Sequence, residues 1–576
     1  MTTAVADSPT RSMEHEQARG HVPRLGRGRW RDVWPRAWGH DGLALYGALG
    51  LTLCGLVLRL CFLFQPMRYD EATTYLAFAS KGLATILVSY TAPNNHVLHT
   101  ILVHYACALL GPYPWVIRLP ALVAGTLLIP ATYLVARLFY DARVALLSAA
   151  LVASSSALVL YSTNARGYTM VSLIFLALLA LAWRLREHRS RRGWQAFVLL
   201  SAAGFFTVPV MLYPFGVVVL WLILSAALGD VRVPKAHLLK DLLKAVVGVA
   251  ALTATLYAPI VAFDGLKALV ANDYVQARGW PAFLAALAGL WAFVGAQWDQ
   301  EYPAAIRLVL LVGLATGVGL HRRVGATRAP LPLAVVGWCV PLLLLSGRVA
   351  FPRVYLFLLP VGAMVAAAGL VALADLALHG AQRFAPLHAS TGRGQRGLRR
   401  YPANQPSTSA DLPARPGGQR AGDAPLNGAA TTRARRSGRG LRVVVALALA
   451  VAVVKGVDDV QRQTAYSSND TGTLRDAAAI TADLKPSLRL GDAVVNQLPS
   501  DAPLAYYFLR SGIPLSYVYA VPRHAPRLFA VVSLAEGQTL RGVLRAERIA
   551  TRAYTLPRLL RRYRYADVYD MRRVIR

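Results

Sequence analysis

Acidic residues and cysteines are both scarce in this chain of 576 residues. It holds 29 Asp and Glu against 62 Lys and Arg, and only 16% of its residues are charged, whereas 55% are apolar. This balance, with a mean hydropathy of +0.42, excludes an ordinary soluble domain and indicates a polytopic membrane protein. The four cysteines show no CxxC or metal-like spacing, so we expect buried small apolar residues. They are Cys54, Cys61, Cys107 and Cys339.

The formal net charge of +33 suggests at first a nucleic-acid-binding protein. Its arginines, however, gather in the turns between apolar segments on one side and in one linker. This is the positive-inside pattern of a membrane protein, in which Lys and Arg collect in the cytoplasmic loops. We therefore expect a lipid bilayer as a partner and no nucleic acid.

Eleven apolar segments are predicted to cross the membrane, because a crossing helix needs about 20 apolar residues. They are 42–65, 117–138, 143–163, 168–184, 195–207, 208–228, 245–261, 304–320, 331–346, 354–378 and 441–457. Two further segments, 97–111 and 282–298, are assigned to the outer surface. If 97–111 crossed, the turn with Arg137 and Arg143 and the turn with the five arginines between 184 and 192 would lie outside, which the positive-inside rule disfavours.

The predicted fold class is a mainly α, polytopic membrane protein with about eleven transmembrane helices and a small C-terminal extracytoplasmic α/β domain. The predicted parts are a basic cytoplasmic tail (1–41), a transmembrane catalytic domain (42–378), a disordered Arg/Pro/Gly-rich cytoplasmic linker (379–440), a last transmembrane helix (441–457) and the extracytoplasmic domain (458–576). Within the last part, short apolar runs predict strands and amphipathic runs predict helices. The strands are expected at 492–496 and 528–533, and the helices at 502–510, 538–547 and 556–563.

Polar and ionisable residues converge on the predicted outer face, where they are costly and usually functional. Carboxylates there can act as general bases, arginines can hold a phosphate, and amides and imidazoles can bind sugar hydroxyls. The candidate catalytic residues are Asp70 and Glu71. The candidate substrate-binding residues are Arg68, Tyr69, Asn95, His96, Arg118, Arg166, Tyr168 and Arg353.

Each of these candidates also has a purely structural explanation. Asp70 and Glu71 could cap the helix that follows them and favour its first turn. His96 could lie in a solvated loop or cap a helix. Arg118 and Arg166 could extend to lipid headgroups without touching a substrate.

Four short motifs, taken in order, resemble those of GT-C membrane glycosyltransferases. They are Arg68-Tyr-Asp-Glu71, the Asn-Asn-His-x-Leu run at 94–98, Arg118-Leu-Pro120 and the Ala-Arg-x-Tyr run at 165–168. The sequence is similar to dolichyl-phosphate-mannose protein mannosyltransferases and to bacterial aminoarabinose (lipid A) transferases over residues 42–375.

The resemblance implies a polyprenyl-phosphate-linked sugar as donor, used on the outer face of the membrane. It also implies Asp70 as the catalytic base, Glu71 in support and Arg166 as a contact to the lipid phosphate. Relatives often place a carboxylate where Asn164 stands in this sequence. We therefore expect metal-independent chemistry and no cofactor.

The predicted function is transfer of a sugar, with inversion, to a hydroxyl of a lipid, glycan or protein acceptor. The protein is expected in the cell (inner) membrane, with its site facing away from the cytoplasm. The alternatives are a polyprenyl-linked lipid transporter or flippase, a polymer ligase, and an inactive membrane scaffold. A transporter would carry ionisable residues near the membrane midplane, and the predicted spans hold almost none there.

Overall fold

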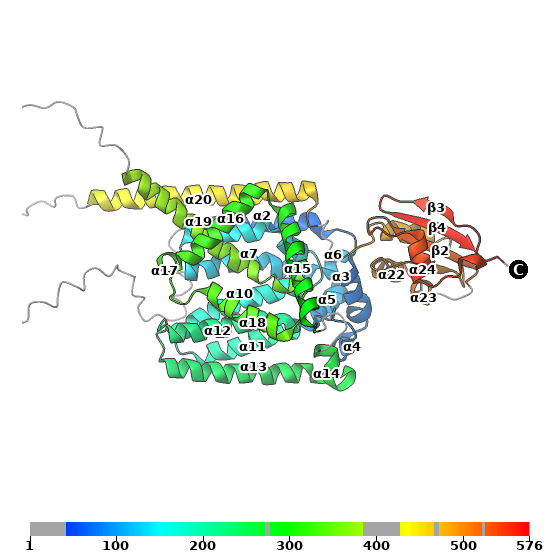
Figure 1. Cartoon of the computed structure of the whole chain (residues 1–576), viewed down its shortest axis with the longest axis horizontal. Coiled ribbons are helices and arrows are strands. Elements are labelled where there is room, and N and C mark those ends of the chain that lie inside the picture. The colour runs from blue at the N-terminus through cyan, green and yellow to red at the C-terminus, as the bar shows by residue number, and fades with distance from the viewer. Residues whose placement is uncertain (1–41, 271–276, 384–426, 466–471, 521–524, 575–576) are drawn as a thin grey trace, which may run out of the picture.

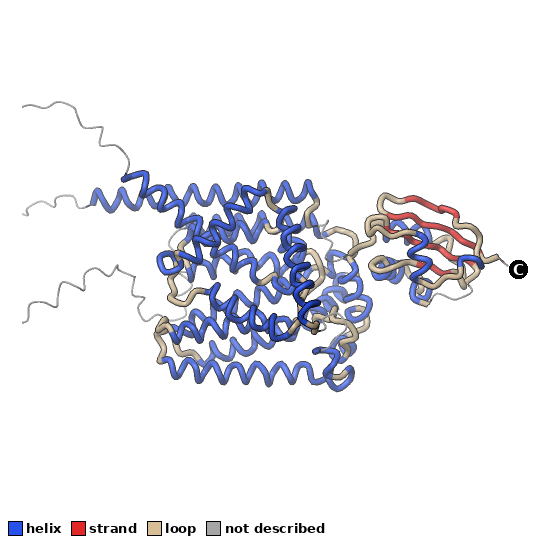
Figure 2. Tube along the Cα trace, viewed as in Figure 1, coloured by secondary structure: helices blue, strands red, loops and turns tan. Residues whose placement is uncertain are grey.

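The computed structural model describes residues 42–270, 277–383, 427–465, 472–520 and 525–574, so the predicted tail 1–41 lies outside the described residues. Long helices run side by side along the longest axis of the molecule, and a small domain containing a sheet lies beyond one end of this bundle (Figure 1). In the described residues outside that small domain, the colouring by secondary structure shows helices joined by loops, and the strands all lie in the small domain (Figure 2). The predicted mainly α, polytopic fold class is confirmed.

All eleven segments predicted to cross the membrane are helical. They correspond to α2 (Gly42–Leu63), α7 (Leu119–Phe139), α8 (Ala142–Ser154) with α9 (Ser156–Ser162), α10 (Tyr168–Glu187), α11 (Arg191–Thr207), η3 (Pro209–Met211) with α12 (Leu212–Ala227), α13 (Lys235–Asp264), α16 (Ala304–Gly319), α18 (Leu331–Ser346), α19 (Leu358–Arg383) and α20 (Asn427–Arg462). Among the described residues, eight helices are long and apolar enough to cross a membrane, or up to nine with the bent pair α8–α9. One of the eight is α15 (Trp280–Glu301), which was not predicted to cross. The predicted crossings that do not meet this test are α11, which has 17 residues, and the shorter apolar helices α16 and α18.

The two segments assigned to the outer surface form α5 (Val97–Leu110) and α15 (Trp280–Glu301). A helix of 14 residues such as α5 is about 21 Å long, which is too short for a hydrocarbon core of about 30 Å. Helix α15 is long enough to cross. It nevertheless runs across the long helices rather than along them (Figure 1), as expected of a helix outside the bilayer.

The short helices of the bundle lie at its two opposite ends. α3 (Tyr69–Thr74), α4 (Leu83–Val88), α5 and α6 (Pro114–Ile117) lie at the end of the bundle that faces the small domain, whereas α17 (His321–Val324) lies at the opposite end (Figure 1). Because α17 carries Arg322 and Arg323, the basic turn and the polar loops occupy opposite ends. This is the separation that the charge pattern predicts. The remaining short bundle elements are η2 (Tyr75–Ala79), α14 (Leu266–Val270) and η4 (Pro352–Tyr355).

Outward-facing apolar side chains cover the bundle, as expected of helices that contact lipid. Leu243 on α13 is 65% exposed, for example, and Val454 on α20 is 69% exposed. The expectation of buried cysteines is wrong for Cys61, which is exposed, and holds fully only for Cys339. A membrane helix has no need to turn a small apolar thiol inward, because lipid is as apolar as the protein core.

The small domain contains a four-stranded sheet in the order β1-β2-β4-β3. Its strands are β1 (Ala493–Val495), β2 (Arg527–Ser533), β3 (Arg558–Arg562) and β4 (Ala566–Arg572), and its helices are α21 (Ala477–Leu484), α22 (Asp501–Arg510), α23 (Ser516–Tyr519), α24 (Leu540–Ala546) and the short η5 (Thr551–Ala553). β1 is parallel to β2, and the other neighbours are antiparallel. The predicted mixture of helices and strands is therefore present.

The helix predicted at 556–563 is wrong, because β3 occupies these residues. All five residues of β3 are exposed, and the strand forms one edge of the sheet by pairing with β4. The paired leucines of this segment resemble one face of a helix, but pairing with β4 overrides that local pattern.

The linker predicted at 379–440 is helical at both ends. Helix α19 extends to Arg383 and α20 begins at Asn427, while 384–426 lies outside the described residues.

The two faces of the sheet contact different partners. Phe529 and Val531 of β2 pack in a cluster that includes Met67 and Ala72 of the bundle. The intervening residues of β2, Leu528, Ala530 and Val532, pack with Val543 and Leu544 of α24. Helix α24 therefore covers the face of the sheet opposite the one that shares a cluster with the bundle.

Candidate functional site

A fully buried ion pair joins Glu71 of α3 to Arg118, at the start of α7. Arg118 donates a hydrogen bond of 2.9 Å from Nε to Glu71 Oε2, and its terminal nitrogens also bind the carbonyl oxygens of Leu63, Gln65 and Pro66. Neither Arg118 nor Glu71 has any exposed side-chain surface. Arg118 therefore does not extend to lipid headgroups but fastens the end of the first span to the second.

Glu71 accepts two further hydrogen bonds from backbone groups. The N–H of Arg68 lies 2.8 Å from Oε1, and the N–H of Ala165 lies 3.2 Å from Oε2. The first bond caps α3, as the structural explanation of this carboxylate proposed. The second ties the 163–167 loop to α3. With all these partners, Glu71 is placed to position the site rather than to take a proton.

Asp70 points to a different environment from its neighbour. Its Oδ1 accepts a hydrogen bond of 3.1 Å from Asn94 Nδ2. Its Oδ2 lies 3.6 Å from an Arg353 terminal nitrogen, is buried, and makes no hydrogen bond. A carboxylate oxygen that is close to a cation but not bound by a donor can still accept a proton from a substrate hydroxyl.

Tyr168 lies at the centre of the remaining polar residues. Its hydroxyl accepts a hydrogen bond of 3.3 Å from Arg353 Nε. The guanidinium carbon of Arg166 lies 5.7 Å from the centre of the Tyr168 ring, and the His96 ring lies edge-on to it at 4.9 Å. Four of the predicted substrate-binding residues are thus brought together from α5, the 163–167 loop, α10 and η4.

His96 holds its place through a hydrogen bond with the backbone. The Gly167 N–H donates to His96 Nδ1 over 2.8 Å, so the ring proton resides on Nε2, which is buried without a partner. A Cβ at position 167 would lie 2.4 Å from Thr207 Cγ2 and 3.1 Å from His96 Nδ1, so this approach requires glycine. Burial, followed by the charge of Arg166, lowers the pKa of His96 well below its ordinary value.

His99 lies one turn further along α5. Burial, with a smaller contribution from Arg166, lowers the pKa of His99 to about 3, so its ring is neutral at physiological pH. Neither ring nitrogen has a hydrogen-bond partner in the described part of the chain. His96 is the N-cap residue of α5, and His99 lies in the first turn of that helix.

Buried groups without partners concentrate in the 163–167 loop. Arg166 is 2% exposed, and its Nε and Nη1 make no hydrogen bond to the described residues. The side-chain amide of Asn164 is fully buried, and both of its polar atoms are also without partners. Because unmet buried polar groups are costly, this loop is expected to receive a polar ligand. Arg166, like Arg118, does not extend to headgroups.

The charges of this cluster favour an anion. Arg166 and Arg353 carry two positive charges against one negative charge on Asp70, while Glu71 and Arg118 neutralise each other. His96 and His99 are neutral and add donors without charge. An anionic leaving group such as a phosphate would balance the charge of the cluster and bind the two Arg166 nitrogens that have no partner among the described residues.

Three predicted site residues point elsewhere. Arg68 is buried, and its guanidinium binds Gln65 and the carbonyl oxygen of Ala465 at the end of α20. The Tyr69 ring packs in the cluster shared with the small domain. The Asn95 amide binds the carbonyl oxygens of Ile86 and Ser89.

Two residues at the site were not among the predicted candidates. Asn94 binds Asp70 in the place where Asn95 was predicted to act, and His99 joins His96. The His96–His99 spacing was a signal that could have revealed the second histidine. Nothing in the sequence distinguishes Asn94 from Asn95, because the choice depends on the turn that precedes α5.

The small domain contacts the loop that carries Asp70. Thr473 forms an isolated β-bridge with Arg68, the Tyr69 N–H donates to the Gly472 carbonyl over 3.0 Å, and the Met67 N–H donates to the Tyr507 hydroxyl over 3.3 Å. The Tyr506 hydroxyl donates to the Pro112 carbonyl over 2.6 Å. The loop that carries Asp70 is therefore held from both the bundle and the small domain.

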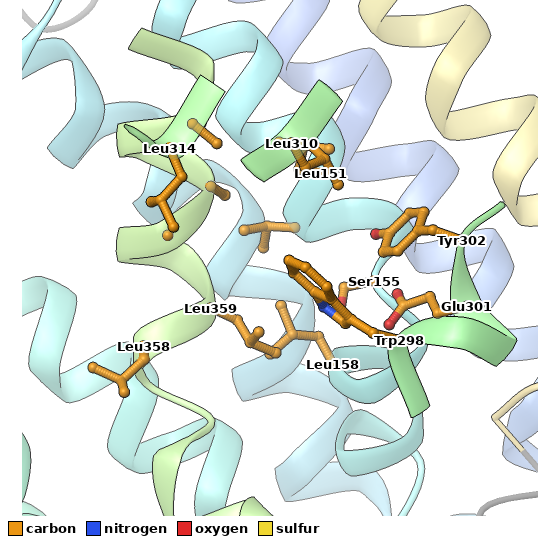
Figure 3. Close-up of a pocket in the computed structure, with 14 residues that line it drawn as sticks. Leu151, Ser155, Leu158, Trp298, Glu301, Tyr302, Leu310, Leu314, Leu358 and Leu359 are labelled. Atoms are coloured by element: carbon orange, nitrogen blue, oxygen red, sulfur yellow. The ribbon is translucent and has the colours of Figure 1, made fainter. Parts of the chain in front are cut away.

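An apolar cavity of about 170 Å³ opens beside the bend between α8 and α9 (Figure 3). Leucines from α8, α9, α16 and α19 line it, and Ser155, Glu301 and Tyr302 form its polar side. The 60° bend frees backbone groups, which buried polar side chains satisfy: Arg59 binds the Ala153 carbonyl and Glu301 binds the Ser156 N–H. Helices α9 and α19 lead from this cavity toward Arg166 and Arg353 respectively.

Among the described residues, no three His, Cys, Asp or Glu side chains gather closely enough to hold a metal ion. The buried carboxylate of Glu71 belongs to the pair with Arg118, and Asp70 has Asn94 and Arg353 as neighbours. The expectation of metal-independent chemistry stays a prediction.

Comparison with known proteins shows which chains this one is similar to. Residues 97–257 match the family described as "Dolichyl-phosphate-mannose-protein mannosyltransferase", a stretch that contains His99, Arg118, Arg166 and Tyr168. No curated protein matches the sequence. The crystal structure of ArnT from Cupriavidus metallidurans in the apo state is similar, with a TM-score of 0.52 and 14% identity over 91% of this chain and 97% of that chain.

A second crystal structure of the same ArnT, bound to undecaprenyl phosphate, gives a TM-score of 0.48 and 15% identity over 91% of this chain and 97% of that chain. The chain is a polytopic membrane protein whose fold is similar to that of ArnT, and its residues 97–257 are similar to the dolichyl-phosphate-mannose-protein mannosyltransferase family.

Proposed function

We propose that this protein transfers a sugar from a polyprenyl-phosphate donor to an acceptor hydroxyl, on the outer face of the cell membrane. The observation that carries the proposal is the buried Asp70 beside Arg353, next to the unpartnered guanidinium nitrogens of Arg166. The description of the matched family, which names a lipid-phosphate-linked sugar, supports the same donor class.

The proposed reaction uses these groups in one step. Asp70 takes the proton of the acceptor hydroxyl, whose oxygen attacks the anomeric carbon of the donor. The bond from that carbon to the lipid phosphate breaks, and Arg166 and Arg353 stabilise the departing phosphate. Attack opposite the leaving group inverts the anomeric configuration. Tyr168 holds Arg353 in place, while His96 Nε2 donates to a sugar or phosphate oxygen.

The apolar cavity is the proposed site for the lipid tail of the donor. The leucine-lined cavity beside α8 and α9 is apolar and adjoins the helices that lead to both arginines. An isoprenoid chain lying there would keep its phosphate near Arg166 and Arg353 at the outer surface. The charge separation between α17 and the site end of the bundle supports the outward orientation.

The test uses membranes that carry the wild type, Asp70→Asn, or Asp458→Asn as a matched control. Asp458 forms an exposed ion pair with Arg462 within one helix, so its loss should have little effect. The membranes receive a panel of radiolabelled polyprenyl-phosphate sugars together with native envelope acceptors. We expect transfer by the wild type and the control, and none by Asp70→Asn at equal expression.

Transfer by Asp70→Asn at the wild-type rate would refute the assignment of the base. Movement of an intact labelled lipid across the membrane without sugar transfer would favour a flippase. Adding EDTA should leave the wild-type rate unchanged, and a loss of activity that divalent cations restore would contradict the metal-independent mechanism.

A further inference from the structure

The last part of the small domain is strongly basic. Residues 541–576 contain eleven Arg, no Lys and only three acidic residues. Two of those carboxylates are already paired, since Asp567 binds Arg562 and Asp570 binds Arg527. The surplus of positive charge therefore lies on the arginines that these carboxylates do not reach.

Three of these arginines line one groove. A surface depression of about 610 Å³ is bordered by Arg541, Arg545 and Arg548 together with apolar residues of α24 and the segment after it. All three arginines are exposed. None of the three makes an ion pair within the described ranges 472–520 and 525–574. Arg541 and Arg545 lie in α24, which ends at Ala546, and Arg548 follows it. At the rise of a helix, these seven steps distribute the charges over about 10 Å.

Arg548 has a backbone conformation that residues other than glycine rarely adopt. Arg548 has φ of +54°, and it follows α24 at the position where a helix end in this conformation usually has glycine. The N–H of Arg548 binds the carbonyl of Arg545, and the N–H of Ile549 binds that of Leu544, which closes the helix. Glycine would adopt this conformation without steric cost. An arginine in this conformation lowers the stability of the small domain relative to glycine, and it places a guanidinium at the groove.

The groove belongs to the small domain, which lies beyond one end of the membrane bundle (Figure 1). Val543 and Leu544 of α24 pack on the face of the sheet opposite the one that shares a cluster with Met67 and Ala72 of the bundle. The groove is therefore not covered by the bundle, and a ligand can reach it from the aqueous side.

We propose that this groove binds an anionic polymer of the aqueous envelope, a glycan that carries phosphate or carboxylate groups. Exposed arginines with no carboxylate partner bind such groups in a bidentate manner. The apolar residues between them, such as Leu540 and Ile549, would contact the uncharged parts of the chain. The proposal does not depend on the transferase mechanism, since it concerns a surface outside the candidate site.

The test is a binding measurement on the full-length protein in phosphatidylcholine nanodiscs, with a fluorescent short-chain polyphosphate as the probe. The groove variant replaces Arg541, Arg545 and Arg548 with Gln. The control variant replaces Arg558, Arg561 and Arg562 of β3 with Gln, which removes the same charge from the same domain. We expect the groove variant to bind about tenfold more weakly, from three exposed contacts of a few-fold each, and the control to bind within about twofold of the wild type.

Equal weakening in both variants would show a general electrostatic attraction and overturn the proposal, as would no weakening in either. Co-sedimentation with phosphatidylglycerol vesicles distinguishes a lipid surface from a polymer. Vesicle binding that the groove variant loses, without polyphosphate binding, would also overturn it. The single change Arg548→Gly should raise the melting temperature and weaken polyphosphate binding. Unchanged binding by this variant would contradict the role given to Arg548.

Discussion

The hydroxyl of Thr473, in the small C-terminal domain, donates a hydrogen bond of 2.7 Å to the carbonyl oxygen of Met67, three residues before Asp70. Together with the bond from Tyr69 to Gly472, it adds a short strand-like pairing to the loop that carries the proposed base. A domain without a recognisable catalytic motif thus contacts the candidate site through its backbone.

The first prediction concerns this contact. Thr473→Val keeps the shape of the side chain but leaves the Met67 carbonyl without its partner, at a cost of about 1–3 kcal/mol. We expect a lower rate of sugar transfer, with kcat reduced more than the donor KM changes, because the loop is positioned less accurately. Steady-state kinetics on purified protein measures both quantities.

Thr481→Val is the matched control for Thr473→Val. Thr481 is buried in α21 of the same domain, and its hydroxyl binds the Ala477 carbonyl within its own helix. If both variants lose activity equally, the effect belongs to the stability of the domain and not to its contact with the loop.

The second prediction separates the two adjacent carboxylates. Glu71→Gln leaves Arg118 buried without its counter-charge, so we expect a loss of about 3 kcal/mol in the free energy of unfolding. Asp70→Asn keeps an oxygen that can accept the hydrogen bond from Asn94 and removes the charge of a long ion pair with Arg353, so it should change stability by about 1 kcal/mol or less. Thermal unfolding in detergent measures both. A marked drop in stability for Asp70→Asn alone would reverse the roles assigned here.

The third prediction concerns Arg166. Because two of its guanidinium nitrogens have no partner among the described residues, Arg166→Gln should leave the protein as stable as the wild type. If Arg166 binds the departing phosphate, kcat/KM for the donor should fall by about 10- to 100-fold, the equivalent of one charge-assisted hydrogen bond. Arg143→Gln, which affects the partly exposed pairs of Arg143 with Asp141 and Asp375, serves as the control. Unaltered kinetics in Arg166→Gln would exclude the phosphate contact.

The fourth prediction is a pH dependence of stability. The pKa of His99 is lowered to about 3 in the folded protein by burial and by Arg166, whereas an unfolded chain binds that proton near pH 6.5. The unfolded state therefore holds more protons between these values, and stability falls as pH decreases below about 6.5, by up to about 1.4 kcal/mol per pH unit for this group.

His99→Leu tests this dependence directly. The variant should show a shallower decrease in melting temperature between pH 7 and pH 5 than the wild type, with His96 retaining its own contribution. An identical pH profile would show that His99 titrates in the folded protein and is not buried as described.

How much of the site could be predicted depended on the kind of residue. Asp70, His96, Arg166, Tyr168 and Arg353 were identified because charged and polar groups are conspicuous beside apolar segments. The roles within the cluster could not be predicted, since Asp70 and Glu71 are neighbours in sequence but point to different partners. Arg118 and Ala165, which are distant in the sequence, donate hydrogen bonds to Glu71. These bonds are the reason for proposing that Glu71 positions the site and that Asp70 reacts.

The sequence by itself determined the membrane helices, because about 20 consecutive apolar residues have few alternatives to a helix in lipid, where every backbone group must be satisfied within the segment. It also determined which ends of those helices carry the basic turns. Tertiary structure decided the edge strand at 558–562, the position of Asn94 at Asp70, and the contact of Thr473 with Met67. Each of these depends on pairing between segments far apart in the chain, whose energy is absent from any local pattern of residues.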